Sequence, residues 1–240
     1  MTSPPDRASL SSMSAEHPQY GFILVDKPAG WTSFDVVAKL RNITGIRKIG
    51  HAGTLDPFAT GLLVVAIGRQ ATKQIDQYVK KAKRYDATFE LGKTSTTQDI
   101  EGEITDNKVT SFPDRDAVEQ AMSLFIGDIK QIPPMHSAIK IDGKKLYELA
   151  RQGKEIDRPA RDVTIHEFKI VNYEAPMLDV TMDVGSGTYV RALAQDLGEK
   201  LGTGAYATAL RRMTVGEFDI KNAYKIEDIT KENWETLLMR

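Results

Sequence analysis

The chain has 240 residues, 41% of them hydrophobic and 27% charged, which is enough for one large folded domain or two small ones. Its 32 basic and 33 acidic residues give a net charge of −1, so any basic surface must be local. With no cysteine and four scattered histidines, disulfides and a thiol nucleophile are excluded and no metal site is expected. No apolar run approaches the roughly 18 to 20 residues that cross a bilayer, and no signal-peptide segment is seen, so we expect a cytoplasmic protein outside membranes.

The first part of the chain divides into a polar tail and a folded region. Residues 1–19 are rich in Ser, Pro and charge, which predicts a disordered tail. The apolar runs at 22–25 and 62–67 predict buried strands. Between them, Ser33 is placed to cap a helix over 34–43 that ends at Gly45.

The later elements mix strands and helices. Strict alternation predicts a half-buried strand over 84–91, followed by a polar loop over 92–103. A helix is predicted over 118–125, strands over 163–171 and 178–184, a helix over 188–201, a last strand over 216–220 and a terminal helix within 226–240. The absence of a regular strand-helix-strand rhythm favours an α+β fold.

The most unusual segment is GHAGTLDPFATG at residues 50–61. Its glycines permit backbone conformations or close approaches that other residues do not, and Pro57 keeps Asp56 out of the helical region. Asp56 should therefore stand rigidly on a loop before a buried strand. Isolated Asp-Pro pairs usually form simple turns, so spacing alone leaves open both a structural turn and a catalytic carboxylate.

The same segment resembles the signature of a known family. Gly-His-x-Gly-x-Leu-Asp-Pro-x-Ala-x-Gly, followed by Gly68 and Ala71-Thr72-Lys73, is similar to the active-site motif of the bacterial tRNA pseudouridine-55 synthases. Five further blocks resemble the family's other motifs in the same order, at residues 26–30, 83–85, 133–140, 187–191 and 210–212. The resemblance covers residues 20 to about 220.

The resemblance implies a pseudouridine-synthase-like catalytic domain over 20–225, with a mixed, largely antiparallel sheet flanked by helices and loops. It implies an isomerase that converts uridine-55 in the T loop of tRNA to pseudouridine, with Asp56 as the essential carboxylate and no metal or cofactor. A uridine inside a folded loop has to be flipped out to be reached. Attack on C1′, attack on C6 and removal of a ribose proton all remain open as the role of the aspartate.

The resemblance also implies roles for other side chains. Tyr85 would stack on the flipped base, and Arg191 would pair with Asp56 and lower its pKa, although a core tyrosine and a surface arginine are the ordinary alternatives. His51 would fill the gap left by the base or stack within the loop, with a turn histidine bonded to the backbone as the ordinary alternative. Leu210 would line the pocket, although by itself it is typical of a core residue, and Lys27 and Pro28 would support the catalytic loop. The remaining substrate-binding candidates are Gly53, Thr54, Lys73, Lys83, Arg84, Lys140 and Tyr189.

Two segments carry local positive charge. Residues 69–84 hold six basic residues against one acid, and we expect phosphate contacts there. Residues 140–161 hold seven basic residues against four acids. The family inserts a segment here that grips RNA, so we expect an RNA-gripping arm over about 129–161.

After Arg212 only 28 residues remain, too few for the complete PUA-type domain of many family members, so we expect a short C-terminal helix over 226–240 instead. The expected partner is tRNA, with no membrane, no obligate protein partner and a monomeric state. An RNA-folding chaperone that opens the T loop is an alternative function. A small-molecule hydrolase using Asp56 would need a second acid or base, which the motif lacks.

Overall fold

The computed structural model of the chain describes residues 20–137, 139–141, 143–150, 152–154 and 156–239. The predicted tail over residues 1–19 lies outside the described residues. The elements in chain order are β1 (Gly21–Lys27), α1 (Ser33–Thr44), β2 (Ile49–His51), β3 (Thr60–Ile67), α2 (Gly68–Thr72), α3 (Ile75–Val79), β4 (Lys83–Leu91), β5 (Lys93–Ser95), β6 (Ile104–Asp106), α4 (Arg115–Ser123), β7 (Gly127–Gln131), β8 (Lys140–Ile141), β9 (Lys144–Lys145), α5 (Leu146–Ala150), β10 (Arg161–Glu174), β11 (Met177–Val184), α6 (Val190–Lys200), β12 (Ala205–Val215), β13 (Phe218–Asp219) and β14 (Tyr224–Lys225), with 3-10 turns at Ile220–Asn222, Ile226–Asp228 and Trp234–Leu237.

One ten-stranded sheet runs through the molecule in the order β14-β1-β3-β12-β4-β11-β10-β7, with β2 on β3 and β13 on β12. The pairs β1–β14 and β3–β12 are parallel and the other pairs are antiparallel. The α+β class with a mixed, largely antiparallel sheet is therefore confirmed. The helices and strands predicted in its main body are confirmed too, with ends shifted by a few residues.

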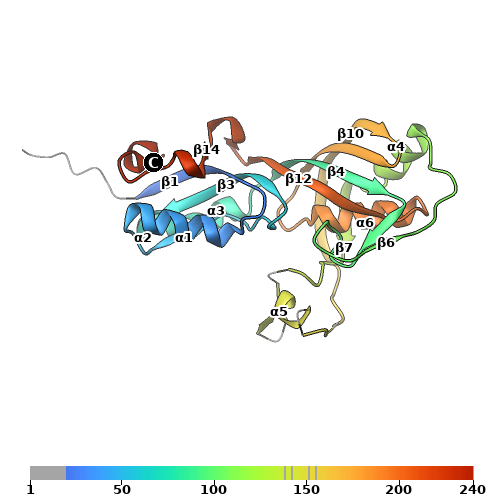
Figure 1. Ribbon diagram of the computed structural model, residues 1–240, viewed down its shortest axis with the longest axis horizontal. Coiled ribbons are helices and arrows are strands. Elements are labelled where there is room, and N and C mark those ends of the chain that lie inside the picture. Colours follow the sequence, from blue (N-terminus) through green and yellow to red (C-terminus); the bar gives the residue numbers. More distant parts are fainter. Residues whose placement is uncertain (1–19, 138, 142, 151, 155, 240) are drawn as a thin grey trace, which may run out of the picture.

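The sheet joins two halves of an elongated molecule (Figure 1). At one end lie β1, β3, α1 and α2, and at the other lie β4, β10, α4 and α6, with β12 running between them. The loop that carries Asp56 connects β2 to β3. Because β3 pairs with β12 at Arg211 and Arg212, this loop sits where the two halves meet.

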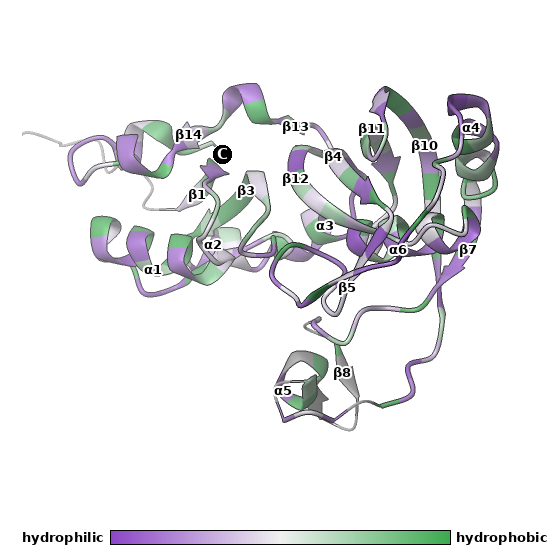
Figure 2. Cartoon of the chain, turned by 45° about the vertical axis from the view of Figure 1, so that its right-hand side comes forward, coloured by the Kyte–Doolittle hydropathy of each residue, from purple (hydrophilic) through white to green (hydrophobic). Residues whose placement is uncertain are grey.

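The continuous apolar run in β1 is explained by burial of both faces of the strand. In β1, Ile23 and Val25 pack with α1 in one core, whereas Phe22 and Leu24 pack with Ala71 and Phe218 in another. A strand covered on both faces needs apolar residues at every position, as predicted. A third, larger core lies between α4, α6 and strands β4, β10 and β11. Hydrophobic and hydrophilic bands alternate along α1 and along the strands in Figure 2.

The start of α1 differs from the prediction. Thr32, not Ser33, is the N-cap, and it forms a capping box with Asp35. The Ser33 hydroxyl instead accepts the amide of Leu55 at 2.8 Å and lies 3.2 Å from the Leu55 carbonyl oxygen. The hydroxyl therefore joins the helix to the residue before Asp56. The C-cap at Gly45, with φ of 72°, is as predicted.

Several elements were missed by sequence reasoning. The long strand β12 carries Arg211 and Arg212 in its middle, which breaks the apolar alternation that predicts a strand. The stretch predicted as a loop over 92–103 contains β5, which pairs with β6. The strand predicted over 216–220 is reduced to Phe218–Asp219.

The C-terminal segment is not the predicted helix. It forms two short 3-10 turns, and the backbone of Met239 then exchanges hydrogen bonds of 2.8 Å with Phe22 of β1. A backbone that pairs as an extended strand cannot continue a helix, which explains the difference. Ile226, Ile229 and Trp234 are buried against the α1 core.

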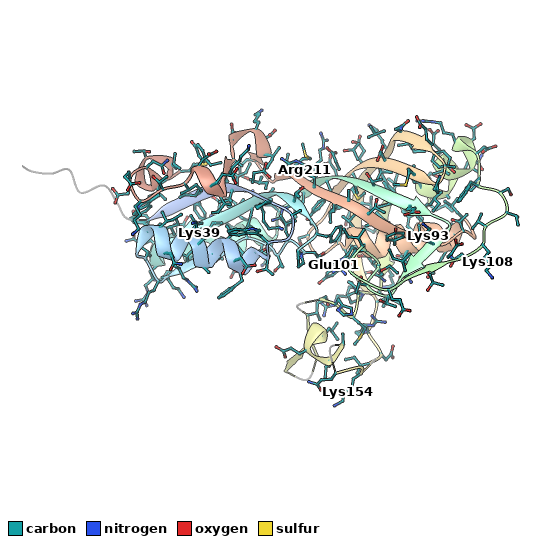
Figure 3. All side chains as sticks on the ribbon, viewed as in Figure 1. Lys39, Lys93, Glu101, Lys108, Lys154 and Arg211 are labelled. Atoms are coloured by element: carbon teal, nitrogen blue, oxygen red, sulfur yellow. The ribbon has the colours of Figure 1, made fainter. Side chains whose placement is uncertain are left out.

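Residues 132–160 leave the sheet between the adjacent strands β7 and β10 and project from the body as a separate arm that carries α5 (Figure 1). Lys154 lies at the far side of this arm (Figure 3). This is the segment in which we expected an RNA-gripping arm.

Gly61 is required where β3 meets β12. Its φ is +100°, and a Cβ atom there would lie 2.7 Å from the backbone nitrogen of Arg212 and would overlap the Arg212 carbonyl oxygen. Gly127 has nearly the same φ, +99°, but its Cβ would meet open space. The two glycines share a positive φ that other residues rarely adopt, and they differ in the space available to a Cβ atom.

We expect Gly61→Ala to destabilise the protein more than Gly127→Ala. The Gly127 variant carries only the cost of unfavourable φ, about 1–3 kcal/mol, whereas the Gly61 variant also has to separate two paired strands. Urea unfolding followed by circular dichroism measures both free energies of unfolding. Equal losses in the two variants would contradict the close approach.

Candidate active site

Asp56 occupies the irregular loop between β2 and β3. Its carbonyl accepts the Ala59 amide at 3.1 Å, so the chain turns immediately after the Asp-Pro pair. The side chain of Asp56 is 31% exposed, and its neighbour Leu55 belongs to the largest core. The Asp56 side chain therefore lies at the edge of the core and remains partly accessible to solvent.

Arg191 is the immediate partner of Asp56. Its Nε lies 2.8 Å from Oδ2 and its Nη2 lies 3.2 Å from Oδ1, so the guanidinium faces the carboxylate with two nitrogens. The side chain is only 3% exposed and also donates to the carbonyls of Thr97 and His136. The structure thus brings together the two residues that the resemblance implied, and Arg191 is a buried side chain of α6 rather than a surface one.

Asp99 is a member of the site that sequence reasoning missed. Its Oδ2 lies 3.3 Å from Nη1 of Arg191, and both side chains are 3% exposed. Thr97 and the amide of Glu101 donate to its Oδ1 at 2.5 and 3.0 Å. The only signal was the polar, Thr-rich character of residues 92–103, which marked a loop but did not single out this carboxylate.

Burial raises the pKa of Asp56 above its ordinary value, and the nearby Asp99 carboxylate adds to the rise. Arg191 opposes this effect but does not reverse it. Arg191 lowers the pKa of Asp56, as the resemblance implied, but the cost of removing the carboxylate from water outweighs this effect, so the pKa as a whole is raised. Glu101, whose backbone amide donates to Asp99, also has a raised pKa, chiefly from burial and then from Asp99 and Asp56.

Apolar and aromatic side chains stand beside this ionic group. Tyr85 of β4 and Leu210 of β12 are buried in the same core as Leu55 and Phe58. Tyr189 begins α6, and its backbone is held by both ends of the Gln131 amide at 2.8 and 3.1 Å. Burial raises the pKa of the Tyr189 hydroxyl. Tyr85 and Leu210 thus share a core with the residue before Asp56, and Tyr189 caps the helix that carries Arg191.

Buried cations hold the backbone of the loop. Lys27 donates to the carbonyls of Pro28, Trp31 and Pro57, which fits the supporting role expected of Lys27 and Pro28. Burial lowers the pKa of Lys27 to about 8. Gly53, with φ of +89°, presents its carbonyl to Nη2 of the buried Arg212 at 3.1 Å.

The two remaining loop candidates differ in exposure. The side chain of Thr54 is exposed, whereas His51 on β2 is half-buried with its Nδ1 unpartnered among the described residues. Burial lowers the pKa of His51, and the positive charge of Arg212 lowers it further. His51 is therefore biased toward the neutral imidazole.

The basic stretch at residues 69–84 is split between surface and interior. Arg69, Lys73 and Lys80 are exposed. Lys83 is buried and donates to the carbonyls of Val79 and Lys81, and burial lowers its pKa to about 8. The expected phosphate contact by Lys83 does not fit this placement, because alternate residues of β4 point to opposite faces and Lys83 points inward.

The two other basic candidates, Arg84 and Lys140, are not seen as free, exposed cations. Arg84 forms a two-point pair with Asp183, with distances of 2.9 and 2.6 Å, so its charge is already matched. Lys140 belongs to β8, but its side chain lies outside the described residues.

Among the described residues, no three His, Asp or Glu side chains gather so as to hold a metal ion. No described helix is long and apolar enough to span a membrane.

Comparison with known proteins decides the family. Residues 41–190 match the model of the TruB family pseudouridylate synthase N-terminal domain, and residues 191–239 match the tRNA pseudouridylate synthase B C-terminal domain. The chain belongs to the TruB family of pseudouridylate synthases. It is thus an isomerase, as expected from the sequence.

Curated relatives agree over most of the chain. A protein of Corynebacterium glutamicum strain R named tRNA pseudouridine synthase B is 46% identical over 230 residues, covering 94% of this chain and 77% of that protein. The proteins of the same name from Paenarthrobacter aurescens and Thermobifida fusca are 44% and 43% identical, each covering 88% of this chain and 70% and 75% of their own lengths.

Solved structures share the fold. A chain of a Cbf5-Nop10-Gar1 complex superposes with a TM-score of 0.70 at 30% identity over 88% of this chain. The archaeal box H/ACA sRNP Nop10-Cbf5 complex gives a TM-score of 0.68 at 27% identity over 91% of this chain. This chain spans about half the length of those solved chains, 54% and 56%.

We expect Asp99→Asn to move the acid limb of pseudouridine formation to lower pH. Asp99 raises the pKa of Asp56, so removing its negative charge lowers that pKa, and a carboxylate needed in its ionised form stays active further into acid. The kcat-pH profile measures the shift. Asp162→Asn, which removes an exposed carboxylate paired with Lys130, is the control and should leave the profile unchanged. A shift to higher pH in the Asp99 variant would contradict the electrostatic assignment.

Proposed function

We propose that this chain isomerises uridine-55 in the T loop of tRNA to pseudouridine, with Asp56 as the catalytic carboxylate. The observation that carries the proposal is the Asp56–Arg191 pair, whose carboxylate remains partly open while its partner is buried. Tyr85, Leu210 and Tyr189 lie on the elements beside it, and the curated relatives bear the name tRNA pseudouridine synthase B.

The reaction exchanges one bond for another. The bond between N1 and C1′ breaks, the uracil ring turns within the site, and a bond forms between C5 and C1′. The C5 proton is then lost to solvent and N1 gains a proton, so the atoms balance without any co-reactant. Asp56 can attack C1′, attack C6 or remove a ribose proton, and all three routes need the ionised carboxylate that Arg191 favours.

The base has to leave the T loop before Asp56 can touch its nucleotide. Tyr85 offers a flat ring on which the extruded uracil can stack, and His51 lies on β2 at the entry to the same loop. A neutral His51 suits insertion between bases better than a charged one, because burying a charge among bases costs free energy.

Exposed cations on the side of α2 and α3 supply local attraction for phosphate. Arg69, Lys73 and Lys80 follow the catalytic loop in sequence and are exposed, in contrast to Lys83. A protein with a net charge near zero can bind RNA in this way only through a local patch, and its affinity falls as salt rises.

The test is tritium release from a tRNA transcript labelled at C5 of uridine. We expect release by the natural protein and none above background by Asp56→Asn, because an amide can neither attack carbon nor take a proton. Filter binding should show that Asp56→Asn still binds the transcript.

The control transcript carries cytidine in place of uridine-55 and should release no tritium above that of the protein-free sample. Release from this control would show that a different uridine is the target. Binding without any release by the natural protein would overturn the proposed reaction and favour the alternative of an RNA chaperone.

A further inference from the structure

Three side chains from outside the catalytic loop form hydrogen bonds with the backbone of alternate loop residues. The Gly53 carbonyl accepts from Arg212 at 3.1 Å, the Leu55 backbone is bonded to Ser33, and the Pro57 carbonyl accepts from Lys27 at 3.2 Å. Asp56 lies within this held segment, and its carboxylate meets Arg191 instead.

Arg212 is the unusual member of this set. It is a charged side chain only 1% exposed, and no carboxylate of the described residues lies within ion-pair distance of it. Its Nε donates to the Leu62 carbonyl at 2.7 Å and its Nη2 to the Gly53 carbonyl. Burying a charge that is matched only by carbonyls costs free energy of folding, so we expect a compensating role for Arg212.

The geometry indicates that role. Gly53 and Leu62 bracket the catalytic loop, one before Asp56 and the other in β3 after it. A guanidinium is planar and has donors at fixed separations, so Nε and Nη2 of Arg212 reach the two carbonyls from one rigid group. The Arg212 side chain therefore links the backbone before the catalytic loop to the strand after it.

We propose that Arg212 and Ser33 are positioning residues for pseudouridine formation, which fix the backbone on either side of Asp56 so that its carboxylate meets the substrate. Neither side chain touches the Asp56 carboxylate in the structure, and both act through the loop. The inference rests on the proposed function for its effect on rate, but the loop order it invokes can be measured without any turnover.

The variants are Arg212→Lys and Ser33→Ala. Lysine keeps the charge but replaces the two donor nitrogens Nε and Nη2 with a single one, and alanine loses the hydroxyl that binds Leu55. The matched control is Arg115→Lys, the same change in an exposed arginine of α4, which pairs with Glu119 and has no bond to the loop.

The first measurement is amide hydrogen exchange by mass spectrometry. We expect faster exchange, about tenfold or more, in peptides covering residues 50–61 of both variants, with no change over β4 and none in the control. Unchanged exchange in this loop in both variants would overturn the inference, whatever the activity of the natural protein.

The second measurement is single-turnover pseudouridine formation with enzyme in saturating excess over transcript. A displacement of the carboxylate by about 1 Å predicts a loss in the rate constant of pseudouridine formation on the order of 10- to 100-fold, with the dissociation constant for tRNA within about threefold of the natural value. The acid limb of the profile should also move to higher pH, because Asp56 displaced from Arg191 loses the charge that lowers its pKa.

The outcomes separate the two proposals. An inactive natural protein whose variants still show the local exchange change would overturn the proposed reaction and keep only the ordering of the loop by Arg212 and Ser33. An active natural protein whose variants keep its rate constant would overturn the positioning role. Where Arg212→Lys fails to fold, Ser33→Ala decides, since it removes a single oxygen atom.

Discussion

The arrangement of the site depends on one ion pair, between the partly exposed Asp56 and the buried Arg191. A carboxylate beside an apolar core has to find a cation or give up its charge, because water no longer solvates it fully. The cation comes from α6, 135 residues further along the chain. The sheet therefore has to bring the β2–β3 loop next to the start of that helix. Asp99 then pairs with Nη1, a different nitrogen of the same guanidinium.

A rigid loop is the second requirement, and buried hydrogen bonds supply it. The glycines of the motif allow the chain to pass close to β12, most tightly where Gly61 meets Arg212. Side chains from β1, α1 and β12 then bind the loop backbone at 53, 55 and 57. Because these supports come from three elements, the position of Asp56 depends on the whole half of the fold around β1 and β3.

The basic residues show how a nearly neutral chain divides its charge. Lys27, Lys83 and Arg212 are buried and donate to backbone carbonyls, whereas Arg69, Lys73 and Lys80 are exposed. Lysine and arginine therefore serve two purposes here, loop support and the proposed contact with phosphate. A count of charges along residues 69–84 cannot separate them, since neighbours such as Lys83 and Arg84 point to opposite faces of β4.

The sequence by itself determined most of the local structure and singled out Asp56 as the candidate carboxylate. Apolar periodicity located β1, β3, β4, β10, β11 and the helices α1, α4 and α6, because a period of two or 3.6 reports which face is buried. The motif around Asp56 was visible because proline restricts the backbone and glycine frees it, and because the segment resembles the signature of a known family. Only the tertiary structure revealed Asp99 beside Arg191, the burial of Lys83 and Arg212, the bond of Ser33 to Leu55, and the raised pKa of Asp56. Those features depend on contacts between residues far apart in the chain, and burial and electrostatic environment are set by such contacts rather than by neighbours in sequence.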